Sequence, residues 1–170
     1  MSALAMVFAL AALPGCKNRE GCDANQPCFC SGGSDCYLGC TGDGCNQDCH
    51  SVGNACGTVC DNNCTTVCHD VPRCTSSCGN GCNVDCHNVQ SCGVICGDRC
   101  AYTCQSVDQC GVQAGAGSTI TCVNVHTCDV TCTGSCRVSC SSGVASCNIT
   151  CPNGSVATTC PDGTQACGAC

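Results

Sequence analysis

Cysteine spacing is the feature that most constrains this chain, because it repeats along most of the sequence. From Cys56 onward, two series of cysteines recur every 18 residues. The first series is Cys56, Cys74, Cys92, Cys110 and Cys128, and the second is Cys68, Cys86, Cys104, Cys122 and Cys140. Looser copies begin at Cys36 and Cys147, which gives seven coils of the form C-x3-C-x3-C-x3-C. A repeat of fixed length predicts a solenoid in which each coil packs on its neighbours.

The residues between the cysteines predict the shape of one coil. Counted from the first cysteine, positions 1, 3, 5 and 9, 11, 13 carry the cysteines and apolar residues such as Val94 and Ile120. This period of two is typical of strands with one buried face. Positions 6 to 8 are rich in Gly, Asn and Asp, which favour tight turns. We therefore expect an all-β, flattened β-solenoid with two short strands per coil and coils about 4.8 Å apart. The repeat leaves its handedness open, and a rounder three-sided coil also fits it.

The composition indicates that disulfides replace a conventional core. The chain has two Phe, two Tyr and no Trp, but 31 cysteines among its 170 residues. So little apolar surface cannot offset the entropy that folding removes. A cysteine fraction this high is typical of exported, disulfide-rich proteins.

One coil indicates how the cysteines pair. In the Cys110 coil, positions 5 and 9 are Ala114 and Ser118, so both cysteines are missing together. Joint loss is expected if position 5 pairs with position 9, and we place position 1 opposite position 13 in the same way. The outer pairs predicted on this basis are Cys36–Cys49, Cys56–Cys68, Cys74–Cys86, Cys92–Cys104, Cys110–Cys122, Cys128–Cys140 and Cys147–Cys160. The inner pairs are Cys40–Cys45, Cys60–Cys64, Cys78–Cys82, Cys96–Cys100 and Cys132–Cys136. This scheme leaves Cys22, Cys28, Cys30, Cys151, Cys167 and Cys170 unassigned.

The N-terminus has the features of an export signal. Residues 3–13 form an apolar run of signal-peptide length, too short to cross a bilayer as a helix. The following Leu13-Pro14-Gly15-Cys16 resembles the lipobox of bacterial lipoproteins, which implies cleavage after Gly15 and lipidation of Cys16. Removing Cys16 also leaves 30 cysteines, an even number. We expect a signal peptide at 1–15, a lipidated tether and cap at 16–35, repeats at 36–159 and a cysteine-stapled cap at 160–170. Secretion without an anchor is the alternative.

Together, the coils and the lipobox resemble the cysteine-rich repeat lipoproteins of the bacterial cell envelope. The resemblance rests on CxVxCxGxCxVxC-type coils and implies a fold and a location, outer-membrane attachment through the lipid, but no activity. We expect a non-enzymatic structural or interaction lipoprotein, a disulfide-rigidified rod whose protein or glycan partner the sequence does not identify. The alternative is an exported thiolate metal-binding protein.

Other functions find less support in the residues. Twelve acidic residues against five basic ones give a net charge of −7, which disfavours nucleic-acid binding. No catalytic constellation is recognisable, and we expect no cofactor. His50, His69 and His87 follow the fourth cysteine in three successive coils, so they should stack at one corner; a solvated corner is favoured over a metal site there. The terminal Cys167-Gly168-Ala169-Cys170 is interpreted as a staple rather than a redox pair.

Overall fold

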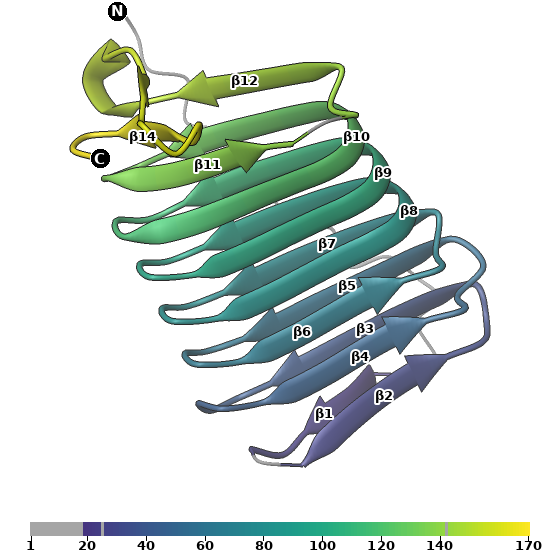
Figure 1. Ribbon diagram of the computed structural model, residues 1–170. Helices are drawn as coiled ribbons and strands as arrows, with labels where there is room; N and C mark the ends of the chain where they lie inside the picture. The colour runs from purple at the N-terminus through teal and green to yellow at the C-terminus, as the bar shows by residue number, and fades with distance from the viewer. Residues whose placement is uncertain (1–18, 25, 142) are drawn as a thin grey trace, which may run out of the picture.

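The chain forms a two-layered β-solenoid, shown in Figure 1 from its computed structural model. The structure describes residues 19–24, 26–141 and 143–170. Seven two-stranded coils follow one another from Arg19 to Cys140, and a further strand and a C-terminal cap complete the stack. The predicted all-β, flattened solenoid with many disulfides is confirmed, and the coil has two sides rather than three.

Each coil contributes one strand to each of two facing layers. The first layer contains β1 (Arg19–Cys22), β3 (Asp35–Cys40), β5 (Ala55–Cys60), β7 (Arg73–Cys78), the second halves of β8 (Asn83–Cys96), β9 (Ala101–Ala114) and β10 (Ser118–Cys132), and β12 (Ser146–Thr150). The second layer contains β2 (Pro27–Ser31), β4 (Asn46–His50), β6 (Thr65–His69), the first halves of β8, β9 and β10, and β11 (Cys136–Cys140). The three long strands bend around one corner and so belong to both layers.

Parallel pairing places equivalent residues of successive coils side by side. Cys74 pairs with Cys92, for example, and Val94 pairs with Val112. Because side chains alternate between the two faces of a strand, this register sends the same positions into the interior of every coil. The burial pattern of β3 and β5 alternates strictly, as the sequence predicted.

A ladder of side-chain acceptors fixes the corner formed by positions 6 to 8. The backbone N–H of Asn80 donates to Asn62 Oδ1 at 2.8 Å, and that of Asp98 donates to Asn80 Oδ1 at 2.7 Å. Asp43 and Asp98 extend the ladder by one coil in each direction. The chain approaches closely here, since a Cβ on Gly79 would lie 2.8 Å from Asp61 O. Glycine is therefore required at this step of the ladder.

The opposite corner combines a left-handed residue with a buried valine. Its left-handed residues have φ between 52° and 55°: Ser51, Asp70, Asn88, Ser106 and Asn124. The next residue in each coil is a buried valine: Val52, Val71, Val89, Val107 and Val125. Short polar residues tolerate the left-handed conformation, while the valine packs into the interior and closes the corner.

Disulfides join the two layers at both corners. At the first corner the structure contains three of the five predicted inner pairs, Cys40–Cys45, Cys96–Cys100 and Cys132–Cys136. The other two predicted pairs, Cys60–Cys64 and Cys78–Cys82, are not formed, and these four thiols contact one another across neighbouring coils. Cys22–Cys28 closes the corner of the first coil.

The predicted outer pairs are wrong. Position 13 bonds to position 1 of the next coil, not of its own coil. The bridges are Cys30–Cys36, Cys49–Cys56, Cys68–Cys74, Cys86–Cys92, Cys104–Cys110, Cys122–Cys128 and Cys140–Cys147. The predicted Cys36–Cys49, Cys56–Cys68, Cys74–Cys86, Cys92–Cys104, Cys110–Cys122, Cys128–Cys140 and Cys147–Cys160 are therefore absent.

The physical reason is that a helical coil places position 13 between two equivalent partners. The sulfurs of Cys74, Cys86 and Cys92 all lie within 4.8 Å of one another, so either neighbour of Cys86 is within reach. Pairing with the next coil also gives Cys30 a partner in Cys36 and Cys147 a partner in Cys140. In the predicted scheme Cys30 remained unassigned.

Both ends of the solenoid differ from the expected boundaries. Residues 19–31 were expected to be tether and cap, yet β1 and β2 pair in register with β3 and β4. The expected last coil is only half formed. After β12, the 3-10 turn η1 (Pro152–Gly154) redirects the chain, and Cys151 bonds to Cys167. Then β14 (Gln165–Cys167) pairs antiparallel with both β13 (Thr158–Thr159) and β11, covering the sheet edge at β11.

Candidate functional site

Four unpaired thiols form the chemically most distinctive cluster in the described part of the chain. Cys60 and Cys64 occupy positions 5 and 9 of one coil, and Cys78 and Cys82 occupy the same positions of the next coil. Parallel pairing of β5 with β7 sets Cys60 beside Cys78. All four side chains point into the interior and are buried. The repeat thus brings two pairs of thiols from separate coils into one place.

The sulfur atoms are close enough to act together. Those of Cys60, Cys64 and Cys82 lie within 4.8 Å of one another. Cys78 completes the cluster through hydrogen bonds with Cys60 and Cys82, and its sulfur lies 3.1 Å from that of Cys96. Backbone oxygens line the same corner, with Asp61 O at 3.4 Å from Cys82 Sγ and Asn62 O at 3.5 Å from Cys64 Sγ.

Hydrogen bonding makes the four thiols unequal as acids. Contacts from Cys60 and then Cys78 lower the pKa of Cys82 to about 3. The contacts with Cys78 and Cys82, together with burial, raise the pKa of Cys60. Cys60 tends to lower the pKa of Cys78, but the contact with Cys82 and burial outweigh it and raise that pKa to about 12. Burial raises the pKa of Cys64. Cys82 is therefore the most acidic of the four thiols.

The interior beside the thiols is more polar than the rest of the core. At position 3 these two coils carry Thr58 and Ser76, and Thr58 Oγ1 donates to Ser76 Oγ at 2.9 Å. Thr66 Oγ1 donates to Gln47 Oε1 at 3.3 Å, and the Gln47 amide donates to two backbone oxygens. From the Cys92 coil onward, position 3 holds valine in three coils and isoleucine in the last. The hydroxyls at position 3 are the sequence signal that distinguishes the coils whose thiols stay unpaired, and sequence reasoning missed it.

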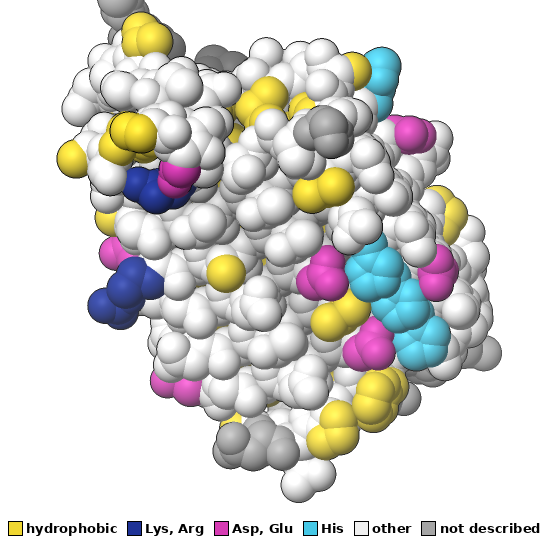
Figure 2. All heavy atoms as spheres, in the orientation of Figure 1, with side chains coloured by type: hydrophobic (Ala, Val, Ile, Leu, Met, Phe, Trp, Pro, Cys, Tyr) yellow, Lys and Arg dark blue, Asp and Glu magenta, His cyan; other side chains and the backbone are white. Residues whose placement is uncertain are grey.

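The three predicted histidines do form a column. The ring centroids of His50 and His69 are 5.1 Å apart and those of His69 and His87 are 4.9 Å apart, with nearly parallel planes. Figure 2 shows this row of His side chains with Asp side chains along both sides. His69 contacts Asp70 at 2.8 Å and Asp48 at 3.5 Å. Ring nitrogens bind metals in the plane of the ring, so parallel stacked rings do not converge on a shared ion. The column is a half-exposed corner of alternating ring and carboxylate groups.

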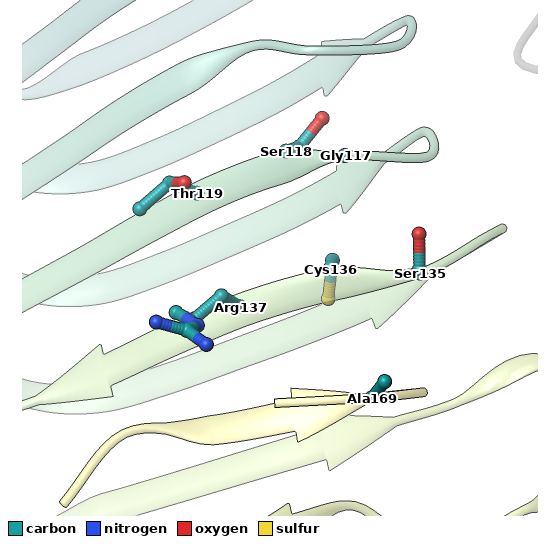
Figure 3. Close-up of a pocket in the computed structure, with 7 residues that line it drawn as sticks. All are labelled: Gly117, Ser118, Thr119, Ser135, Cys136, Arg137 and Ala169. Atoms are coloured by element: carbon teal, nitrogen blue, oxygen red, sulfur yellow. The ribbon is translucent and has the colours of Figure 1, made fainter. Parts of the chain in front are cut away.

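A recess of about 330 Å³ lies between β10, β11 and the C-terminal cap. Figure 3 shows Thr119 and Arg137 on the two neighbouring strands and Ala169 on the cap. The Arg137 guanidinium already donates to Asp162 Oδ2 at 3.2 Å and to Cys170 O at 2.8 Å. Its charge therefore holds the cap in place and is not directed at a ligand.

The remaining predicted residues are Cys16 near the N-terminus and the terminal pair Cys167 and Cys170. Cys16 lies outside the described residues. Cys167 and Cys170 do not pair with each other: Cys167 bonds to Cys151 and Cys170 bonds to Cys160, so the terminal CGAC segment is tied to two separate points. Within the described residues, no helix is long and apolar enough to cross a membrane.

Comparison of the chain with protein-family models, with curated proteins and with solved structures found no match.

Proposed function

We propose that this chain is a non-enzymatic structural or interaction module: a stiff rod that resists proteolysis and presents flat sheet surfaces to a partner. The observation that carries the proposal is the run of disulfides along one corner, in which each coil is bonded to the next from Cys30 to Cys147. A covalent link at every coil limits how far any coil can open alone, because opening must act against its bonded neighbours.

We place the rod outside the cytoplasm, anchored to the cell envelope through a lipid on Cys16. Disulfides persist in oxidising compartments and are rare in the cytosol, so the thirteen bridges support export. The lipobox supports the anchor. One outward column of the second layer is chemically irregular, since it reads Thr65, Asn83, Ala101, Thr119 and Arg137. Such an irregular surface favours a protein or glycan partner over a repetitive lattice such as ice.

The rod proposal is tested by digestion with a broad-specificity protease before and after reduction. We expect the oxidised protein to survive as a full-length solenoid, whereas the reduced protein is degraded. Equal digestion of both forms would contradict the proposal, because the bridges would then contribute no rigidity.

The anchor is tested separately by palmitate labelling of the full chain expressed in a bacterium. Cys16→Ala should abolish labelling, while the matched Cys132→Ala/Cys136→Ala variant should keep it. Unchanged labelling in Cys16→Ala, or none in the parent chain, would refute the lipid anchor and leave the rod proposal standing.

A further inference from the structure

The thiol cluster of Cys60, Cys64, Cys78 and Cys82 has a composition that the rod does not need. The first corner is closed by a disulfide in other coils, and it is closed without cysteines at Ala114 and Ser118. A coil can therefore form at this corner with or without sulfur. Unpaired thiols occur in just two of the described coils, and those two are adjacent. Adjacency is what brings four sulfurs together instead of two isolated pairs.

We infer that these four cysteines form a tetrathiolate site for a single d10 metal ion, with Zn²⁺ as the natural candidate. A tetrahedral zinc site has Zn–S distances of about 2.3 Å, which places the sulfurs about 3.8 Å from one another. Three of the four sulfurs are already within 4.8 Å of one another, so a small inward movement of side chains suffices. The two CxxxC segments supply two ligands each, from strand ends held by the parallel sheet.

Metal binding replaces the hydrogen bonds that the thiols now donate. Cys82 Sγ lies 3.4 Å from Asp61 O and Cys64 Sγ lies 3.5 Å from Asn62 O, and both S–H contacts are given up when the sulfurs coordinate an ion. Binding releases the protons of the four thiols to solvent, so the reaction is one M²⁺ with four thiols, giving M(SCys)₄²⁻ and four protons.

Coordination also accounts for thiols in an otherwise oxidised chain. A thiolate bound to zinc has its lone pairs engaged, and its reactivity toward oxidants and disulfides falls with them. Because the ion binds the folded chain and finds no preformed site in the unfolded one, it also stabilises these two coils.

The test uses the full chain folded under oxidising conditions with Zn²⁺ present, and native mass spectrometry as the readout. We expect one zinc per chain and four cysteines that iodoacetamide labels only after chelation. Substitution with Cd²⁺ should add thiolate-to-metal charge-transfer absorbance at one equivalent. Cys60→Ser/Cys82→Ser should weaken binding by more than the roughly 10- to 100-fold that loss of an outer-shell group costs. Cys132→Ser/Cys136→Ser, which removes the same number of sulfurs elsewhere, should bind as the parent does.

A second variant, Cys64→Ser/Cys78→Ser, tests the same site if the first variant does not fold. Protease resistance of each variant verifies that its solenoid is intact. The inference is overturned if the parent chain contains no zinc and peptide mapping finds Cys60–Cys64 and Cys78–Cys82 bridges. It is also overturned if either protease-resistant variant binds the metal as tightly as the parent does.

Discussion

At the scale of single residues, small polar side chains hold the turns of this solenoid. Asn62, Asn80 and Asp98 each accept the backbone N–H of the residue one coil further on, so one carboxamide or carboxylate oxygen replaces a water at every turn. Such local acceptors allow a tight corner without leaving a donor unpaired.

Removal of one acceptor tests this ladder. Asp98→Ala leaves the N–H of Ala116 without its 2.7 Å partner, and we expect a loss of about 1 kcal/mol in the free energy of unfolding with faster amide exchange at Ala116. Asp98→Asn keeps the acceptor and should protect Ala116 nearly as well as the parent residue. Equal exchange rates in the two variants would show that the side-chain oxygen does not hold the turn.

The cap contains a carboxylate with a shifted acidity. The hydroxyl and backbone N–H of Thr164 donate to Asp162 at 2.6 and 3.0 Å and lower the pKa of its carboxyl. A carboxyl with a lowered folded pKa contributes stability above its unfolded value of about 3.9, and loses that contribution as the pH falls through the folded value. In NMR titrations, Thr164→Val should move the Asp162 pKa upward, whereas Thr119→Val should not. An unshifted titration in Thr164→Val would mean that Thr164 does not set this acidity.

At the scale of strands and corners, the repeated structural unit is a strand followed by a corner, with a disulfide across most of the corners. Beyond the first coil, the bridge at the first corner joins cysteines four or five residues apart, and the bridge at the second corner joins cysteines six or seven residues apart. The two corners differ in turn chemistry but place their sulfurs in the same interior seam between the layers.

The coil without an inner bridge should accept one. Ala114 lies in register between Cys96 and Cys132, whose own bridges span Cα separations of 6.4 and 6.0 Å. Ala114→Cys/Ser118→Cys should therefore form a disulfide. Closing this five-residue loop should raise the free energy of unfolding by about 2 kcal/mol. Loss of the Ser118 hydrogen bonds should lower it by about 1 kcal/mol. The single Ser118→Cys variant measures that loss alone. Two free thiols in the double variant would contradict the corner geometry.

Sequence reasoning predicted the strands, the two corners and three of the five inner pairs because each leaves a local pattern. Alternation marks the strands, and the joint absence of cysteine at Ala114 and Ser118 marks a pair. The outer pairing leaves no such pattern, because every coil carries both positions, so Cys86 has a candidate partner on either side in Cys74 and Cys92. The half-formed last coil depends on the turn at Pro152, and the thiol cluster depends on contacts between coils, which a repeat read one coil at a time does not display.

At the scale of the whole molecule, the outer bridges make the solenoid a continuous covalent ladder. Each outer bridge joins cysteines six or seven residues apart across the connection between two coils, so it shortens that link and limits how far the two coils can separate. Bridges within a coil would leave these connections at their full length.

Trypsin offers a direct test, because it cuts after Lys17 and Arg19 near the N-terminus and then divides residues 20–170 at Arg73, Arg99 and Arg137. The fragment ending at Arg73 should stay joined to the next one through Cys68–Cys74, and the cut at Arg99 should be spanned by Cys96–Cys100. No bridge in the structure's described residues spans the cut at Arg137, so residues 138–170 should be released. Non-reducing mass spectrometry of the denatured digest should therefore find three joined fragments and one free C-terminal fragment. Release of the fragment ending at Arg73, with 138–170 still attached, would instead prove pairing within coils and contradict the ladder.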